Sequence, residues 1–165
     1  MNAATGAPGV LGWLEATPVA MTMRSSLWLY PIVEIFHIVG FTILVGAVLM
    51  FDLRLLGWSR VLPVAGLARH LLPWSAAGLV LIVPAGLLMF SAHPRDFVEN
   101  RVFLLKLALI GLAGFNAWLF HRGVYRSVAG WNADIRAPVS AQLHALASLA
   151  LWIAVICCGR LLAYT

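Results

Sequence analysis

Long apolar runs separated by short polar stretches dominate this chain. Each of four runs approaches or exceeds the roughly 20 apolar residues that a membrane-spanning helix needs. They lie at about 27–51, 63–92, 101–121 and 138–162. The pattern predicts an all-α integral membrane four-helix bundle that forms one domain over residues 25–165. Residues 1–24 lack the basic start and small-residue cleavage site of a signal peptide, so we expect a retained extramembrane lead.

The second run contains prolines that leave two interpretations open. Pro63 can start a helix, whereas Pro73 and Pro84 lie inside the run. Proline is tolerated in the first turn of a helix, and also in membrane helices whose freed carbonyls find other partners. Either one kinked helix runs from Pro63, or a short interfacial helix ends at Leu72 and Pro73 begins the true span.

Composition supports the membrane assignment and excludes other classes. The chain has 165 residues, of which 62% are hydrophobic and 10% are charged, and its mean hydropathy is +0.95. A soluble domain of this size needs more polar surface. No basic patch with interleaved aromatic residues occurs, so we expect a lipid bilayer as partner and no nucleic acid. The adjacent Cys157 and Cys158 would point apart on a helix and are interpreted as packing residues.

The loop arginines predict the orientation. Four spans place both termini on one side of the membrane. The loops at 51–69 and 122–137 carry most of the basic residues found outside the spans, which makes their side cytoplasmic by the positive-inside rule. These residues are Arg54, Arg60, Arg69, Arg122, Arg126 and Arg136. Both termini are therefore expected on the opposite, periplasmic side.

Ionisable residues inside the runs are candidates for function. Glu34 and His37 are three residues apart, so they share nearly one helix face. A carboxylate in hydrocarbon costs a few kcal/mol or more unless it is paired or solvated, so both should point into the protein. Lys106 of the third run falls at a similar depth, because Glu34 is about 7 Å and Lys106 about 9 Å from the span centres. Either the two form an ion pair, or Lys106 extends to the outer interface and Glu34 is protonated or hydrogen-bonded elsewhere.

Three histidines fall in one layer near the cytoplasmic side, about 9 to 13 Å from the span centres, if the second helix starts at Pro63. They are His70, His121 and His144. A b-type haem needs two imidazoles that face each other at equal depth, with small residues beside them. His70 and His144 meet that condition and form a candidate haem pair. His121 is an alternative ligand for copper or zinc. Small residues also line ordinary membrane helix interfaces, so the pattern permits haem without requiring it.

Five motifs carry a resemblance: WLYPIVEIFHIVG, VGAVLMFDLRLLG, LLPWSAAG, KLALIGLAGFNAWLFH and LWIAVICCGRLLAY. Together they resemble an uncharacterised family of bacterial four-helix inner-membrane proteins, over nearly the whole chain after its first twenty residues. The resemblance implies the bacterial inner membrane and no particular activity. More distantly, the layout is similar to copper resistance protein D and to four-helix b-type cytochromes, which pair ligands from helices one with three and two with four.

The family motifs favour a different set of polar residues from the haem pair. His70 and His144 match the pairing of helices two and four, but neither lies in the motifs. The motifs carry a polar string in the first and third runs, made of Glu34, His37, Lys106, Asn116 and His121. Three interpretations are open: a buried hydrogen-bonded network, a proton or quinone contact, or a metal transit path. They also carry polar residues expected at helix ends, namely Asp52, Arg54 and Arg160.

Two functions are left open. The first is a small redox or metal-related membrane subunit that carries b haem or handles copper, together with other membrane or periplasmic redox proteins. The second is a non-catalytic subunit or scaffold whose buried polar residues fix helix packing. A hydrolase or transferase is not expected, because the sequence has no glycine-rich phosphate loop, no paired carboxylates and no Ser/His/Asp constellation with a credible pocket.

Overall fold

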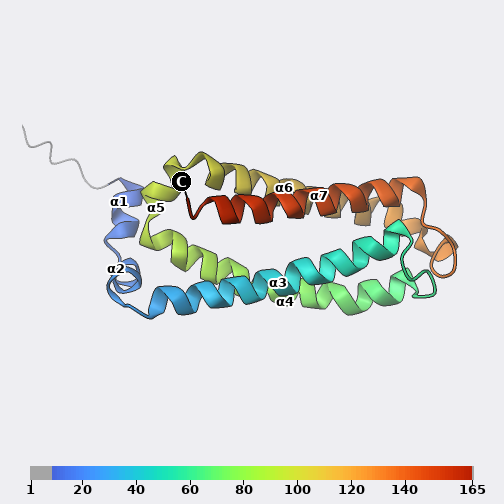
Figure 1. The fold of residues 1–165 in the computed structure, drawn as a ribbon, viewed down its shortest axis with the longest axis horizontal. Helices are drawn as coiled ribbons and strands as arrows, with labels where there is room; N and C mark the ends of the chain where they lie inside the picture. Colours follow the sequence, from blue (N-terminus) through green and yellow to red (C-terminus); the bar gives the residue numbers. More distant parts are fainter. Residues whose placement is uncertain (1–8, 165) are drawn as a thin grey trace, which may run out of the picture.

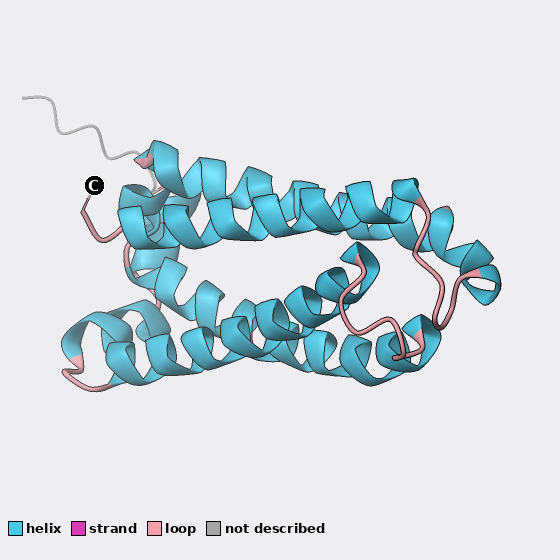
Figure 2. Ribbon diagram, turned by 45° about the vertical axis from the view of Figure 1, so that its right-hand side comes forward, coloured by secondary structure: helices cyan, strands magenta, loops and turns pink. Residues whose placement is uncertain are grey.

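Residues 9–164, the part that the computed structural model describes, form helices joined by short loops (Figure 1). In chain order the elements are α1 (Val10–Glu15), α2 (Pro18–Ser25), α3 (Leu29–Leu56), α4 (Val64–Ala92), α5 (Pro94–Glu99), α6 (Arg101–Arg122), the 3-10 helix η1 (Val124–Gly130) and α7 (Val139–Leu161). No strand occurs between residues 9 and 164 (Figure 2). The all-α prediction is confirmed, and residues 1–8 of the expected lead lie outside the described residues.

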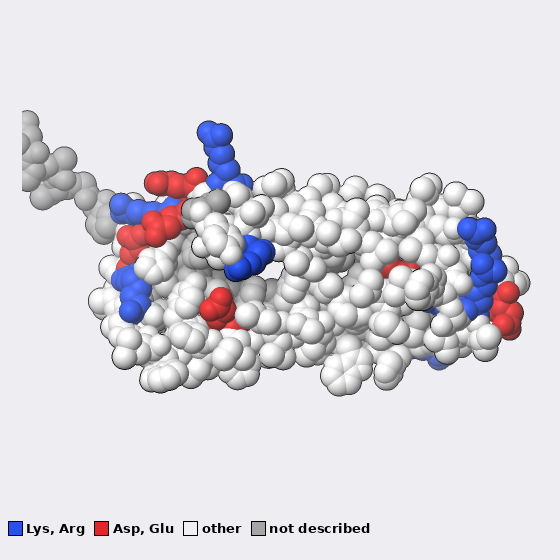
Figure 3. All heavy atoms as spheres, viewed as in Figure 1, with Lys and Arg blue, Asp and Glu red and all other residues white. Residues whose placement is uncertain are grey.

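Four helices are long and apolar enough to cross a membrane: α3, α4, α6 and α7. They coincide with the four predicted runs. Lys, Arg, Asp and Glu gather mainly toward the two ends of the molecule, and the face in Figure 3 is largely uncharged between them. The chain is therefore a polytopic membrane protein. The α1 helix and the C-terminal end lie at the same end of the molecule (Figure 1), and the assignment of that end to the periplasm stays a prediction.

The first span is longer than its apolar run. Although Asp52 and Arg54 follow that run, α3 continues past both and ends only at Gly57, whose φ of 107° is left-handed. The backbone N–H of Gly57 donates to the carbonyl of Arg54, and the N–H of Trp58 donates to that of Leu53. These two bonds form a Schellman motif, for which glycine is the favoured residue. A backbone requirement, and not the appearance of charge, therefore sets the end of this helix.

The second span is one helix. α4 runs through Pro73 and Pro84, which is the first of the two forms that its sequence allowed. The polar stretch after Ala92 is not a plain loop, because Pro94 begins the short helix α5. The side chain of Asn100 then caps α6 by accepting hydrogen bonds from the backbone N–H groups of Val102 and Phe103, at 2.9 and 3.3 Å.

The four spans form two hairpins with an open side. α3 packs along α4, α6 packs along α7, and the hairpins meet where α3 contacts α7. Within the described chain, the backbone of α6 does not approach that of α3 or α4. Side chains bridge α6 and α4 at one end, where Phe90 stacks on Phe103 with ring centroids 5.9 Å apart. A space-filling view shows an opening between the hairpins (Figure 3).

Two glycines bring α3 and α4 close together. A Cβ atom added at Gly78 would lie 2.7 Å from the carbonyl oxygen of Gly40 and 3.0 Å from the backbone nitrogen of Leu44. A Cβ added at Gly40 would lie 2.9 Å from the carbonyl oxygen of Gly78. Small residues allow such approach between membrane helices, where packing rather than a hydrophobic effect holds the helices together. This crossing fixes which face of α4 turns toward α3.

A buried arginine ties the loops together at the end of the hairpins opposite α1. Arg54 is 1% exposed, and its guanidinium donates to the backbone carbonyls of Leu62, Arg60 and Asn132 at 2.6, 2.9 and 3.1 Å. Next to it, Leu55 packs in an apolar cluster with residues of the other three spans and of the last loop. The other members of this cluster are Val64, Phe120, Trp131, Ala137, Ala141 and Ala145. All four spans are thus held at this end.

The lead is also folded against the bundle. Met23 of α2 is buried against α4, and Arg24 donates a hydrogen bond to the carbonyl of Ala92 at 2.8 Å. Arg95 of α5 forms an ion pair with Glu15 of α1 at 3.4 Å. The short helices therefore pack on the α4–α5 end of the spans. Their place outside the membrane stays a prediction.

Candidate functional site

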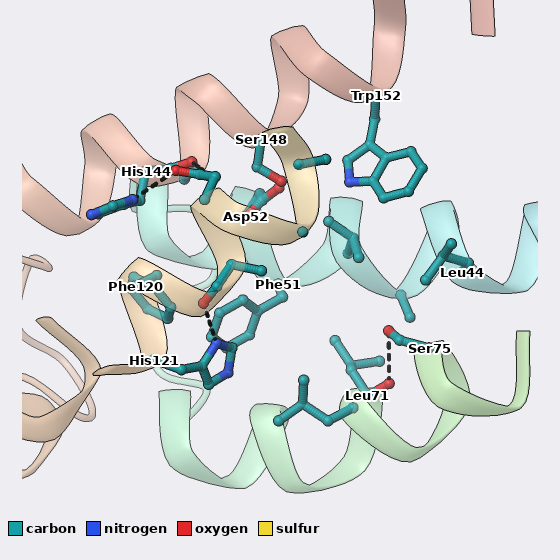
Figure 4. Close-up of a pocket in the computed structure, with 18 of the residues that line it drawn as sticks. Leu44, Phe51, Asp52, Leu71, Ser75, Phe120, His121, His144, Ser148 and Trp152 are labelled. Atoms are coloured by element: carbon teal, nitrogen blue, oxygen red, sulfur yellow. Dashed lines mark hydrogen bonds between the residues drawn. The ribbon is translucent and has the colours of Figure 1, made fainter. Parts of the chain in front are cut away.

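A cavity of about 260 Å³ lies between the two hairpins (Figure 4). All four spans line it, and most of the lining is apolar. Its larger apolar side chains are Leu44 and Phe51 of α3, Leu71 and Leu79 of α4, Ile110 and Phe120 of α6, and Trp152 of α7. The cavity lies toward the end of the hairpins opposite α1, where Arg54 binds the loops and the apolar cluster packs.

The cavity has a side that faces the membrane. Leu72, Leu79 and Ile110 line it and are nevertheless 46%, 47% and 37% exposed. These residues belong to α4 and α6, the two spans whose backbones stay apart. The exposed apolar rim of the cavity therefore lies on α4 and α6.

Asp52 is the most unusual group in this cavity. It is 5% exposed, and its carboxyl group lies beside the Ser148 hydroxyl of α7 (Figure 4). Its second oxygen, Oδ2, is buried and has no partner within the described chain. An unsatisfied buried polar atom costs about 1–3 kcal/mol. The sequence predicted Asp52 as a helix-end residue, and it lies four residues before the end of α3. Its burial among cavity side chains is an additional feature that the sequence did not predict.

His121 brings a second unsatisfied atom to the cavity. Its Nδ1 lies 2.8 Å from the carbonyl oxygen of Ala117, one turn earlier in α6. A carbonyl only accepts, so Nδ1 carries the hydrogen, and Nε2 of the neutral ring is left with a lone pair. This Nε2 is buried and has no partner among residues 9–164. Asp52 and His121 thus each present an unused acceptor to the same cavity.

His144 and Asn116 join α7 to α6 through a reciprocal pair of hydrogen bonds. The His144 Nδ1 donates to Oδ1 of Asn116 at 2.7 Å, and Nδ2 of Asn116 donates to the backbone carbonyl of His144 at 3.0 Å. Both imidazoles of the site pack on one ring, since the Phe120 centroid is 5.3 Å from that of His121 and 5.9 Å from that of His144. These contacts position both histidines firmly.

The structure does not bring together the candidate haem pair. His144 lines the cavity, but His70 is exposed and is not part of the lining. Among residues 9–164 no group of three or more His, Cys, Asp or Glu side chains is placed to hold a metal ion. His70 and His144 therefore do not line one common cavity, and His121 has no cluster of metal ligands around it.

The expected polar network is divided between two places. His37 bonds through Nδ1 to the carbonyl oxygen of Ile82 in α4 at 3.1 Å. Gly86 makes room for this ring, because a Cβ added there would lie 3.2 Å from His37 Cε1. Lys106 instead points toward α7, where its Nζ is 3.6 Å from the position of a Cβ on Gly159. Asn116 joins neither residue and pairs with His144.

The remaining predicted residues lie apart from the cavity. Glu34 is exposed, and the ion pairs within 4.0 Å among the described residues do not include one between Glu34 and Lys106. Arg160 bonds to the Tyr164 hydroxyl and lies over its ring, 4.7 Å from the centroid. Arg54 holds the loops. Of the predicted site residues, the structure therefore gathers His121, His144, Asn116 and Asp52.

Sequence reasoning missed that Asp52 belongs to this group, although a signal was present. Leu44, Val48 and Leu55 precede or follow Asp52 at spacings of eight, four and three residues, which places all of them on one helix face. All of them line the cavity. A carboxylate in the middle of an apolar stripe is an inward-facing group, whatever its distance from the helix end.

Comparison with known proteins identifies a family and little else. The model of a family of unknown function (DUF6644) matches residues 13–165. No curated protein and no solved structure matches the chain. The comparisons thus agree with the resemblance to an uncharacterised family, and they add no support for a relation to copper resistance protein D or to b-type cytochromes.

Proposed function

Since the chain belongs to the DUF6644 family of unknown function, we propose its role from its own geometry: it binds a small lipid-soluble ligand in the cavity between its hairpins. The observation that carries this proposal is an apolar cavity that opens toward lipid and contains two buried, unsatisfied polar atoms. We place the protein in the bacterial inner membrane, as the family motifs suggest.

The size and lining of the cavity suit a ring. A cavity of about 150 Å³ is large enough to bind benzene, and this one measures about 260 Å³. Ligand sites are mostly apolar, with a few polar groups that fix the orientation of the ligand. Phe51, Phe120 and Trp152 supply aromatic walls here, and Asp52 and His121 supply the polar groups.

The sideways opening supports a ligand that arrives through the bilayer. Leu72 and Leu79 of α4 and Ile110 of α6 form an apolar rim. At the loop end, by contrast, the apolar cluster and the loops bound to Arg54 close the site. In a redox role this cavity would hold a membrane-soluble carrier, because His70 does not line it and cannot pair there with His144. A scaffold would not need a cavity with unsatisfied polar atoms.

Two glycines of α6 allow a matched test. Gly114 lines the cavity and Gly111 does not, and a Cβ added at either position meets nothing within 4 Å. The leucine side chain of Gly114→Leu should occupy part of the cavity without a clash, whereas Gly111→Leu adds the same side chain outside the cavity. Naphthalene at 100 times its Kd should stabilise the detergent-purified wild-type protein and Gly111→Leu by about 2.7 kcal/mol, and Gly114→Leu by much less.

The outcomes separate the alternatives. Stabilisation of wild type and Gly111→Leu, with loss in Gly114→Leu, supports a ligand site in the cavity. Absence of any stabilisation, or equal stabilisation of all three proteins, contradicts it. A stable protein that binds no ring compound would favour the scaffold function instead.

A further inference from the structure

We infer that the cavity takes an aromatic ring with hydroxyl groups, of the hydroquinone class, whose O–H groups donate hydrogen bonds to Asp52 Oδ2 and His121 Nε2. This inference rests on the proposed function and specifies its ligand. It follows from counting which donors and acceptors in the cavity are already used.

Most polar groups of the lining have partners. Ser75 donates to the carbonyl of Leu71 at 3.2 Å, and the Ser148 hydroxyl lies beside the carboxyl group of Asp52 (Figure 4). The side chain of Asn116 accepts a hydrogen bond from Nδ1 of His144 and donates one to the backbone carbonyl of His144. The buried side-chain atoms of the lining that stay without a partner in the described chain are Asp52 Oδ2 and His121 Nε2.

Both of these atoms are acceptors. When Asp52 is ionised its Oδ2 has no hydrogen to give, and in the neutral ring the bond from His121 Nδ1 to Ala117 leaves only a lone pair on Nε2. In this state a ligand that satisfies both atoms must donate. A quinone carbonyl or an ether oxygen would face two acceptors and could bond to neither. The indole N–H of Trp152 also lines the cavity, and a hydroxyl suits it because a hydroxyl oxygen accepts as well as donates.

The two acceptors lie at one level. Asp52 and His121 are each about 14 Å from the middle of their own helix, toward the same end of the hairpins. They lie on α3 and α6, on either side of the gap between the hairpins, and Phe51 lies between them (Figure 4). A polar ring at this level would sit near the edge of the hydrocarbon, with its apolar substituents free to pass between α4 and α6 into lipid.

Three ring compounds of similar shape test the inference: 1,4-dihydroxynaphthalene, its dimethyl ether, and 1,4-naphthoquinone. Titration calorimetry of detergent-purified full-length protein under anaerobic conditions gives a Kd for each. A buried acceptor that the ligand leaves unpaired raises the Kd about 10-fold or more. The Kd of the dihydroxy compound should therefore be at least about 10-fold lower than those of the dimethyl ether and the quinone.

Two substitutions check the atoms. Asp52→Asn puts an amide N–H₂ where Oδ2 was, so it should remove the preference for the dihydroxy compound and improve binding of the quinone. His121→Asn can keep the bond to Ala117 but has no Nε2, and should lower the preference for the dihydroxy compound over the dimethyl ether about 10-fold. Helix content by circular dichroism shows that the variants are folded.

The results distinguish this inference from the proposed function. If the ether or the quinone binds wild type as tightly as the dihydroxy compound, or if Asp52→Asn does not change the order, the hydroxyl assignment fails and the cavity remains a ligand site. If none of the three compounds and no naphthalene binds, both the assignment and the proposed function fail.

Discussion

Alanine at Gly78 should loosen the crossing of α3 and α4 that sets the wall of the cavity. The new Cβ would lie 2.7 Å from the Gly40 carbonyl oxygen and 3.0 Å from both the nitrogen and the Cβ of Leu44. Ordinary contact begins near 3.4 Å, so the helices must separate by several tenths of an ångström. Two of the three atoms belong to the backbone and cannot turn aside. Leu44 lines the cavity, so the change also reaches the ligand site.

The size of the effect follows from a matched position. Overpacking costs about 1–3 kcal/mol, while alanine gains about 0.5–1 kcal/mol over glycine within a helix. Gly46 of α3 is the matched position, because a Cβ there meets nothing within 4 Å. We therefore expect Gly78→Ala to lower the free energy of unfolding by about 1–3 kcal/mol, and Gly46→Ala to leave it unchanged or raise it by up to about 1 kcal/mol.

Unfolding in mixed micelles, with increasing SDS and helix content followed by circular dichroism, measures both variants against wild type. Naphthalene binding to Gly78→Ala should weaken in the same preparation. If Gly78→Ala were as stable as Gly46→Ala, the helices would not cross as closely as described. The face that α4 turns toward the cavity would then need to be assigned anew.

Two further substitutions test the buried charges. Arg54→Met removes hydrogen bonds to three loop carbonyls and should lower the free energy of unfolding by about 1.5–3 kcal/mol or more. Arg126→Met, at an exposed position, should change it by less than about 0.5 kcal/mol. Equal melting temperatures of the two variants would show that Arg54 does not hold the loops. Asp52→Leu replaces an unsatisfied oxygen with apolar atoms and should raise stability by about 1–3 kcal/mol while abolishing binding of the dihydroxy ring. A destabilised variant would mean that the contact of the carboxyl group with Ser148 outweighs the cost of the unsatisfied Oδ2.

The number and approximate position of the spans could be predicted because hydrophobic length alone determines them. The grouping of polar residues could not. Depth along the membrane normal is one coordinate, and it leaves open which helices are neighbours and how each is rotated. Asn116 has its partner on α7 because α6 packs against α7 and not against α3. His70 matched His144 in depth, but it lies on another face of α4 from the residues that line the cavity. Around the helix axis it is about 100° from Leu71 and about 160° from Ala68, and both of these line the cavity.

Rotation follows from close packing, which a single sequence does not disclose. In the sequence, Gly40 and Gly78 are two of many small residues. Their close contact can be recognised only when α3 and α4 are known to pack together. Asp52 was predictable as an inward group from its spacing to Leu44 and Leu55, but its apparent place at the end of an apolar run hid this. The unsatisfied Oδ2 and Nε2 atoms depend on side-chain contacts across three helices and lie beyond what sequence patterns can predict.

Photolabelling in membranes tests the central claim, that a ring occupies the cavity between the hairpins, most directly. A photoreactive azidonaphthalene, followed by mass spectrometry of the labelled peptides, should mark cavity residues of several spans, such as Leu71 and Ile110, and excess dihydroxynaphthalene should prevent this in wild type and Gly111→Leu. Gly114→Leu should lose the same labels. Labels confined to outward residues such as Val80 and Leu112, which are 72% and 53% exposed, and unaffected by Gly114→Leu, would contradict the claim.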